Sequence, residues 1–157
     1  RLHYSSDWLY EMTCLNLLED ITKEKGGIPF PNKVSFISQN WKKYPALIQD
    51  STLVTKIIDI EKTINGRTYY YIPKEKVLPF AGQIKSGDII LITTKKKGLD
   101  TAHVGIAIEN EGQIYLLHAS VSDKKVSVTT ETLPDYLQRI TSHSGIMIGR
   151  LINFKSN

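Results

Sequence analysis

The stretch 87–120, GDIILITTKKKGLDTAHVGIAIENEGQIYLLHAS, constrains the fold of this chain more than any other. It contains three apolar runs of strand length, separated by two polar turns. The second turn, Glu111-Gly112, is a two-residue hairpin signal. One histidine begins the second run (His103) and another ends the third (His118). We therefore predict an antiparallel hairpin that carries both histidines.

The pairing of this hairpin predicts that the two histidines share one face of the sheet. If Glu111-Gly112 is centred in the turn, residue i pairs with residue 223 − i, and His118 lies opposite Gly105. His103 is then a diagonal neighbour of His118, about 7–8 Å away at Cα, whereas a shift of one residue would separate the two onto opposite faces. Two adjacent imidazoles can serve as a general base and the residue that orients it. The alternatives are hydrogen bonds to loop backbone at the sheet edge, or a metal site, for which no further ligand has suitable spacing.

The patterns around this stretch predict helices first and strands afterwards. Apolar residues at helical spacing predict helices over residues 8–25 and 51–65. Strands are predicted at residues 34–37, 67–72, 88–93, 103–109, 113–119, 124–129 and 146–152, with one or two helical turns at 132–139. This order indicates an α+β fold with an antiparallel sheet, in one domain of residues 1–157.

Composition narrows the classes of function. The 157 residues are 41% hydrophobic and 23% charged, as in ordinary globular proteins. No apolar run approaches the roughly 18 residues that span a membrane, so we expect no integral membrane segment. The net charge is +4, but the one dense basic run, Lys95-Lys96-Lys97, falls in a turn and no nucleic-acid-binding motif accompanies it. We therefore expect no nucleic-acid partner.

Besides His103 and His118, the sequence contains one cysteine and two further histidines. Cys14 is the only cysteine, which excludes an internal disulfide. It is either a small apolar residue in the core or a reactive thiol. His3 and His143 fall in polar segments, and we predict both to lie on the surface.

Several motifs together resemble a known family. RLHYSSDW, DITKEKGGIPFP, RTYYYIPKEK, the stretch 87–120 and the closing SGIMIGRL are similar to NlpC-type, papain-like cell-wall cysteine peptidases. They most resemble the bacterial N-acetylmuramoyl-L-alanine amidase branch. The resemblance implies helices packed on an antiparallel, partly barrel-like sheet. It also implies hydrolysis of the bond between the sugar lactyl group and L-Ala in peptidoglycan or muropeptides, without a cofactor or metal, in a periplasmic or secreted bacterial protein.

The resemblance also implies roles for single residues. His103 matches the base of the family, and His118 matches the residue that orients the base. The residues that it suggests for binding the substrate are Arg1, Tyr4, Asp7, Trp8 and Ser120. Tyr70 is a further candidate, because Tyr69, Tyr70 and Tyr71 alternate faces and at least one of them could line a cleft with its hydroxyl.

The nucleophile is the point at which this sequence departs from the family. The family cysteine begins a helix and normally precedes the RLHY motif by several dozen residues, whereas this sequence starts at RLHY. We therefore expect the nucleophile upstream of Arg1, and we expect residues 1–157 to be the C-terminal part of an amidase domain.

On this reading the chain alone is inactive unless a further segment or a second chain completes it. Cys14 is the alternative nucleophile, but it falls inside a predicted helix and lacks the free N–H groups that lower a thiol pKa at a helix start. The competing function is a non-catalytic module of the same fold that binds cell-wall fragments or a protein.

Overall fold

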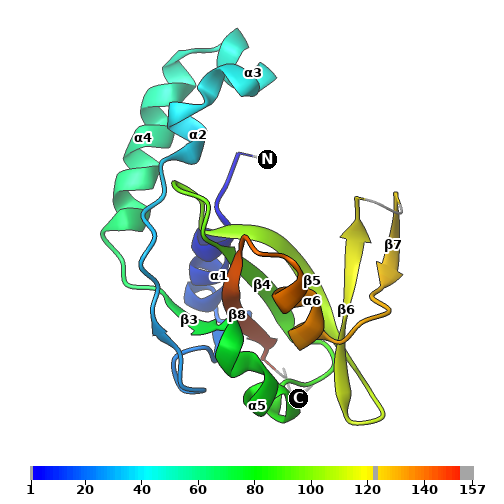
Figure 1. The fold of residues 1–157 in the computed structure, drawn as a ribbon. Helices are drawn as coiled ribbons and strands as arrows, with labels where there is room; N and C mark the ends of the chain where they lie inside the picture. The colour runs from blue at the N-terminus through cyan, green and yellow to red at the C-terminus, as the bar shows by residue number, and fades with distance from the viewer. Residues whose placement is uncertain (1, 122–123, 153–157) are drawn as a thin grey trace, which may run out of the picture.

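An antiparallel sheet forms the centre of the molecule (Figure 1). The computed structural model describes residues 2–121 and 124–152. The strands in this part of the chain are β1 (Leu18–Asp20), β2 (Ile28–Pro29), β3 (Tyr70–Pro73), β4 (Ile89–Thr94), β5 (Thr101–Asn110), β6 (Gln113–Ser120), β7 (Lys125–Val128) and β8 (His143–Leu151). Their order is β2-β3-β8-β4-β5-β6-β7, with β1 also paired to β8. Among these strands β2 and β7 form opposite edges, so the sheet is open and the expectation of a partly barrel-like sheet is wrong.

The hairpin of β5 and β6 has the predicted register. Ile106 pairs with Leu117, as the rule i to 223 − i requires. Glu111 and Gly112 take φ values of 52° and 76°. Positive φ at both central residues gives the turn a twist that matches that of the strands. The predicted placement of alternate side chains along this hairpin is therefore confirmed.

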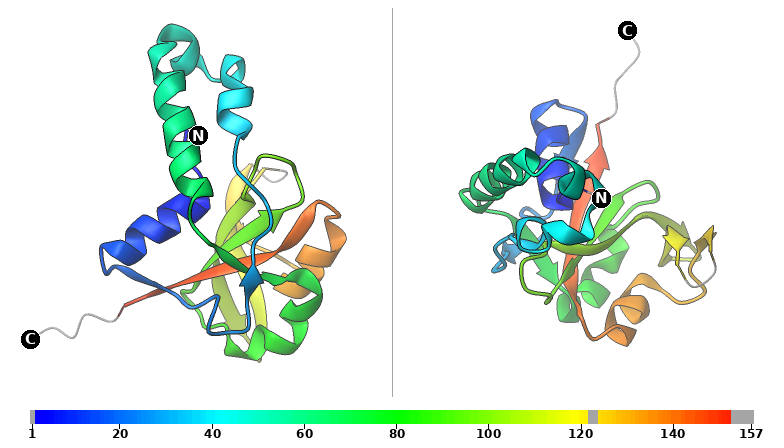
Figure 2. Two further views of the ribbon diagram at one scale, coloured as in Figure 1. Left: turned by 90° about the vertical axis from the view of Figure 1, so that its left-hand side faces the viewer. Right: turned by 90° about the horizontal axis from the view of Figure 1, so that it is seen from above.

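Helices cover both faces of the sheet. The α-helices are α1 (Ser5–Cys14), α2 (Phe36–Gln39), α3 (Pro45–Gln49), α4 (Thr52–Asn65), α5 (Val77–Phe80) and α6 (Leu133–Arg139), and the 3₁₀ turns are η1 (Trp41–Lys43), η2 (Lys74–Lys76) and η3 (Ala81–Gln83). Helices α2, α3 and α4 project from the sheet as a helical arm, which the left view of Figure 2 shows. No helix in the described residues is long and apolar enough to cross a membrane.

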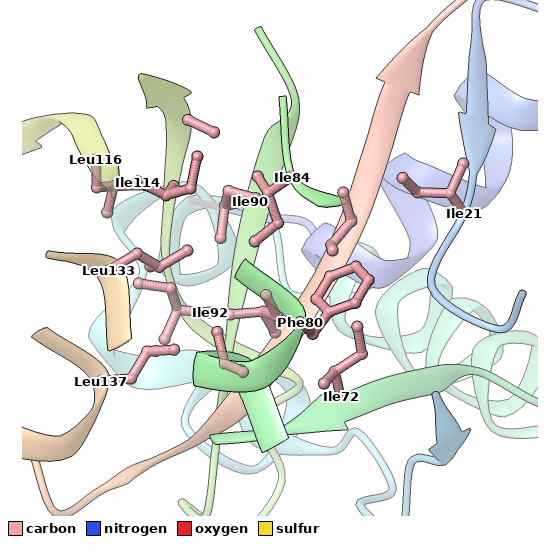
Figure 3. Close-up of a cluster of buried hydrophobic side chains, with 14 residues drawn as sticks. Ile21, Ile72, Phe80, Ile84, Ile90, Ile92, Ile114, Leu116, Leu133 and Leu137 are labelled. Carbon is pink, nitrogen blue, oxygen red and sulfur yellow. The ribbon is translucent and has the colours of Figure 1, made fainter. Parts of the chain in front are cut away.

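The largest core lies between the sheet and helices α5 and α6 (Figure 3). Ile90 and Ile92 of β4 point into it, together with Leu133 and Leu137 of α6. Leu91, between the two isoleucines, points the other way into a second core beneath α1. Since α6 contributes two fully buried leucines, its position over the sheet is fixed by apolar burial.

Two predicted elements are wrong. The helix predicted over residues 8–25 ends at Cys14. Asn16 takes the left-handed conformation at φ 56°, and the Leu17 N–H bonds the Met12 carbonyl, which is the hydrogen bond that closes a helix C-terminus. The chain then forms β1, whose pairing with β8 replaces the helix. The strand predicted at 34–37 is reduced to an isolated bridge at Val34, and α2 follows it.

The other main elements agree with the sequence patterns. Helix α4 matches the predicted helix at 51–65 within one residue, and strands β4, β5 and β6 match their predicted spans within two residues. Helix α6 matches the turns predicted at 132–139, and Thr132 caps its N-terminus by accepting a hydrogen bond from the Asp135 N–H. The sequence therefore predicts the strands that carry His103 and His118.

Candidate active site

A β-bulge at the start of β5 aims the side chain of His103. Ile92 of β4 pairs with His103, but its neighbour Thr93 pairs with Thr101, so Ala102 is an extra, unpaired residue. Thr101 consequently faces α1, where its hydroxyl bonds a serine hydroxyl at 2.8 Å. His103 faces the opposite side, toward α6. Bulges of this kind redirect side chains near functional sites.

His103 and His118 are in direct contact. Nε2 of His103 lies 2.7 Å from Nδ1 of His118. The two rings meet almost at right angles, with an interplanar angle of 88° and centroids 4.9 Å apart. In a neutral pair one of these nitrogens must donate and the other accept, so the tautomers of the two imidazoles are linked.

A cavity of about 680 Å³ opens beside the two histidines, between the β6–β7 hairpin and α6. Three charged side chains, those of Lys125, Glu131 and Arg139, lie on its wall. Hydroxyl groups supply much of the remaining polar surface, from Ser120, Ser127, Thr129, Thr130 and Tyr136. Such a wall offers hydrogen-bond donors and acceptors to a polar ligand held against the histidines.

A row of aromatic rings continues from the histidine pair into the protein. The ring of Tyr136 meets His118 edge-on, with centroids 5.6 Å apart and an interplanar angle of 76°. On its other side Tyr136 contacts His143, again at 5.6 Å, with the planes tilted by 36°. His103, His118, Tyr136 and His143 therefore form a continuous row that draws on β5, β6, α6 and β8.

His143 is buried at 4% exposure, so its predicted surface position is wrong. The reason is a second irregularity in the sheet. Thr93 pairs with Gly145 but Thr94 pairs with His143, which leaves Ser144 as the extra residue. This shift turns His143 toward α6, the side of the sheet that carries His103.

The surroundings of His143 keep it uncharged at neutral pH. The pKa of His143 is lowered to about 4, chiefly by burial and in addition by the nearby charges of His103, Lys74 and Arg139. Its Nδ1 is buried and has no hydrogen-bond partner. A charged His143 would therefore be poorly solvated and would lie among other cationic groups.

Comparison with known proteins identifies the family of this chain. The family model described as AmiA-like, N-acetylmuramoyl-L-alanine amidase-like, matches residues 1–146. The chain belongs to this AmiA-like family. No curated protein matches the chain.

Solved structures of similar proteins share the fold of this AmiA-like chain. A crystal structure of an N-acetylmuramoyl-L-alanine amidase from Bacteroides uniformis is 35% identical with a TM-score of 0.90, and the match covers 98% of this chain and 65% of that one. A Bacteroides fragilis protein described as a candidate xylanase is 37% identical with a TM-score of 0.88, over 96% of this chain and 66% of that one. This chain thus spans about two thirds of the length of these relatives.

A more distant structure shares the fold alone. The Legionella pneumophila protein LPG0564 is 23% identical with a TM-score of 0.65, over 98% of this chain and 62% of that one. The open α+β sheet of the AmiA-like chain is therefore shared by proteins whose sequences have diverged widely.

The N-terminal motif of the AmiA-like chain is engaged in internal contacts. Tyr4 is buried, and its hydroxyl donates a 2.7 Å hydrogen bond to Glu61 of the helical arm. Asp7 forms an ion pair with Arg67, at 2.5 Å. Neither residue lines the cavity beside His103. Arg1 lies outside the described residues.

The other predicted substrate-binding residues lie in three separate parts of the molecule. Ser120 is buried and lines the cavity beside the histidines. Trp8 lines a separate apolar groove at the α1 side of the sheet. Tyr70 lies beneath the ammonium group of Lys23, which is 4.9 Å from the ring centroid. Of the described substrate-binding candidates, Ser120 alone therefore lies beside the histidines, and the roles of all of them stay predictions.

Cys14 lies apart from the candidate site. It is exposed at the last position of α1. The cavity beside His103 is not lined by it. Its position at the C-terminal end of the helix lacks the free N–H groups that stabilise a thiolate at a helix start. Within residues 2–121 and 124–152, no three His, Cys, Asp or Glu side chains are grouped so that they could hold a metal ion.

Sequence reasoning missed His143 and Tyr136. Tyr136 had a usable signal, since it follows Leu133 by three residues and precedes Leu137, which puts it beside the buried stripe of α6. His143 had none, because the bulge that turns it inward leaves no trace in the local pattern. The row of rings therefore has two predicted members, His103 and His118, and two that sequence reasoning missed.

Proposed function

We propose that this chain is the histidine-bearing part of a cysteine-type N-acetylmuramoyl-L-alanine amidase with an NlpC-type, papain-like domain. The observation that carries the proposal is the contact between His103 Nε2 and His118 Nδ1 at the wall of a polar cavity. A thiol hydrolase needs a base whose ring is held by a second residue, and these two histidines supply both. Membership of the AmiA-like family supports an amide of peptidoglycan as the bond that is cleaved.

On this proposal each nitrogen of the two rings has its own role. His103 Nε2 is the atom that faces His118, so His103 Nδ1 is the atom that takes the proton of the nucleophile. His103 must then carry its own proton on Nε2 and donate it to His118 Nδ1. His118 in turn carries its proton on Nε2. When His103 becomes an imidazolium, this hydrogen bond gains charge and strengthens.

The proposed reaction has two stages. The thiolate adds to the carbonyl carbon of the lactyl amide, and the C–N bond breaks as His103 Nδ1–H protonates the departing amine of L-Ala. Water then attacks the thioester while His103 takes its proton. The lactyl carboxylic acid and the free thiol are released. No cofactor takes part in either stage.

The thiol in this proposal comes from a segment other than residues 2–121 and 124–152. Cys14 is the only cysteine of the sequence, and it does not line the cavity beside His103. About one third of the length of the structural relatives lies outside the part that this chain matches. We propose that the complete protein acts on peptidoglycan or muropeptides outside the cytoplasm.

The test is turnover of a muramoyl-peptide by the full-length gene product, followed by mass spectrometry of the released peptide. Cleavage produces a peptide with a free L-Ala amino group. Because His103 moves protons in both stages, we expect His103→Ala to lower kcat by at least about 10²–10⁴-fold. Cys14→Ala is the matched control and should keep full activity.

Two results would change the conclusion. Full activity of a folded His103→Ala variant would contradict the base assignment, and loss of activity in a folded Cys14→Ala variant would reinstate that cysteine as nucleophile. If the wild-type protein binds muropeptides but does not cleave them, the non-catalytic binding module is the better description.

A further inference from the structure

Tyr136 joins His143 to the histidine pair. It is the one ring that contacts both His118 and His143 in the row described above, at 5.6 Å on each side. The backbone of Tyr136 is fixed in place by α6, because Leu133 and Leu137 of this helix are fully buried in the main core. The free side of the Tyr136 ring is thus closed by His143. Removing the His143 ring would leave a gap behind Tyr136, and the Tyr136 ring could rotate into that gap.

The groups that face His143 are cationic or neutral. They are His103 from β5, Lys74 from η2, and Arg139 and Tyr136 from α6. Lys74 is itself buried and donates a long hydrogen bond of 3.5 Å to the Leu137 carbonyl. A proton on His143 would oppose the positive charge that His103 must take up in the proposed reaction. An uncharged ring at this position gives support without that penalty.

We propose that His143 is a positioning residue of this site, whose ring acts through Tyr136 to hold His118 at the angle where its Nδ1 meets His103 Nε2. The chemical consequence rests on the proposed hydrolase function. The arrangement of the rings rests on geometry alone. With His118 fixed, its Nδ1 stays against His103 Nε2, and in the proposed tautomers Nδ1 of His103 is then the basic nitrogen.

The test reads the tautomers of the imidazoles directly, in this chain, with no need for catalysis. Long-range ¹H–¹⁵N spectra distinguish protonated from unprotonated ring nitrogens, and a pH series gives the titration of each ring. The wild type should show one fixed tautomer for His118. The exposed His3 serves as an internal reference.

Two substitutions at position 143 separate ring support from simple burial. In His143→Ala the support is gone, so the His118 nitrogens should shift toward the averaged values of an unrestrained imidazole. In His143→Phe the ring remains, so the His118 tautomer should be that of the wild type. An unchanged His118 spectrum in a folded His143→Ala variant would overturn the proposal. Equal disturbance in the Ala and Phe variants would overturn it too, since ring support would not be the cause.

A second pair of variants covers the case in which His143→Ala does not fold. Tyr136→Leu removes the intermediate ring and should free His118, whereas Tyr136→Phe keeps that ring and should not. No change of His118 in a folded Tyr136→Leu variant contradicts the proposal.

Activity gives the third readout. In the full-length enzyme His143→Ala should lower kcat about 10- to 100-fold, because the base His103 is misplaced. KM should stay near its wild-type value. His143→Phe should keep most of the wild-type kcat. If the spectra behave as expected but the wild type cleaves no muramoyl-peptide, the proposed function fails and the positioning role of His143 stands.

Discussion

Thr101 and His103 lie two positions apart on β5, yet their side chains face opposite sides of the sheet. In a regular strand they would share a face. The unpaired Ala102 between them reverses this relation. Thr101 thereby bonds α1 on one side while His103 reaches His118 on the other. The start of β5 therefore ties the packing of α1 to the geometry of the candidate site.

Gly105, next along the His103 face, leaves no room for a side chain. A Cβ there would lie 2.6 Å from both Cγ and Cδ1 of Leu116 and 2.9 Å from the Leu117 carbonyl oxygen. Leu116 is fully buried, so β6 must shift to make room. We expect Gly105→Ala to lower the free energy of unfolding by about 1–3 kcal/mol, measured by urea denaturation, and to move the ring resonances of His118.

Gly82→Ala is the matched control, because a Cβ at Gly82 meets nothing within 4 Å. It should change the free energy of unfolding by less than about 0.5 kcal/mol. If Gly105→Ala were as mild as this control, the close packing of β5 on β6 beside the histidines would be refuted.

The part of this site that the sequence predicts is the part carried by regular structure. The Glu111-Gly112 turn fixes the register of its hairpin, and the register fixes the shared face of His103 and His118. Each step needs only local residues and a period of two. The sequence alone therefore predicts that these two histidines lie together.

The parts of the site and fold that the sequence does not predict depend on irregular backbone geometry. His143 turns inward because its pairing with β4 shifts by one residue, and no local pattern in the sequence marks the shift. The end of α1 was missed for a similar reason. Apolar residues continue at helical spacing beyond Cys14, but Asn16 turns the chain so that β1 can pair with β8. Tertiary pairing overrides local propensity in that segment.

Tyr4 connects the N-terminal segment to the helical arm. The residue is 2% exposed. Its hydroxyl donates a hydrogen bond to Glu61 and accepts one of 3.0 Å from the Ile37 N–H. Burial raises the pKa of Tyr4 well above its usual value, so the phenol remains a donor. We expect Tyr4→Phe to lower the free energy of unfolding by about 1–3 kcal/mol, because the buried N–H and carboxylate each lose a partner.

The control for Tyr4→Phe is Tyr115→Phe, which removes an exposed hydroxyl that bonds Gln113. It should cost less than about 0.5 kcal/mol. Should Tyr4→Phe instead leave stability unchanged and alter KM for a muropeptide, Tyr4 would contact substrate, as the family resemblance suggests.

Asp88 anchors the end of the last strand to the start of β4. It is 2% exposed and accepts hydrogen bonds from Arg150 Nε at 2.8 Å and Nη2 at 2.7 Å. Asp88→Asn removes the charge from this two-point contact and leaves the guanidinium without its carboxylate. We expect a loss of about 2 kcal/mol in the free energy of unfolding, measured by thermal and urea denaturation.

Asp59→Asn provides the comparison, because the Asp59–Lys62 ion pair is exposed on α4. Exposed pairs contribute little, so this change should cost less than about 0.5 kcal/mol. Equal effects of the two substitutions would show that burial of the Asp88 pair adds nothing to its strength.

The buried imidazole of His143 should make stability depend on pH in a defined window. Its pKa is about 4 in the folded chain, against an ordinary value of 6.5. Between these values the unfolded chain binds a proton that the folded chain does not, so stability rises with pH and levels off above 6.5. This contribution is fully present at neutral pH and is lost as the pH falls toward 4. It amounts to about 2–3 kcal/mol.

His143→Phe removes this titration while it keeps a ring behind Tyr136. Groups distant from His143 titrate equally in both proteins, so their effects cancel when the variant is subtracted from the wild type. Urea denaturation at pH 4, 5, 6 and 7 should therefore show the Phe variant gaining about 2–3 kcal/mol relative to wild type on going from pH 7 to pH 4. Parallel pH profiles would mean that His143 is protonated as easily in the folded chain as in the unfolded one. That result would contradict the claim that burial keeps His143 uncharged.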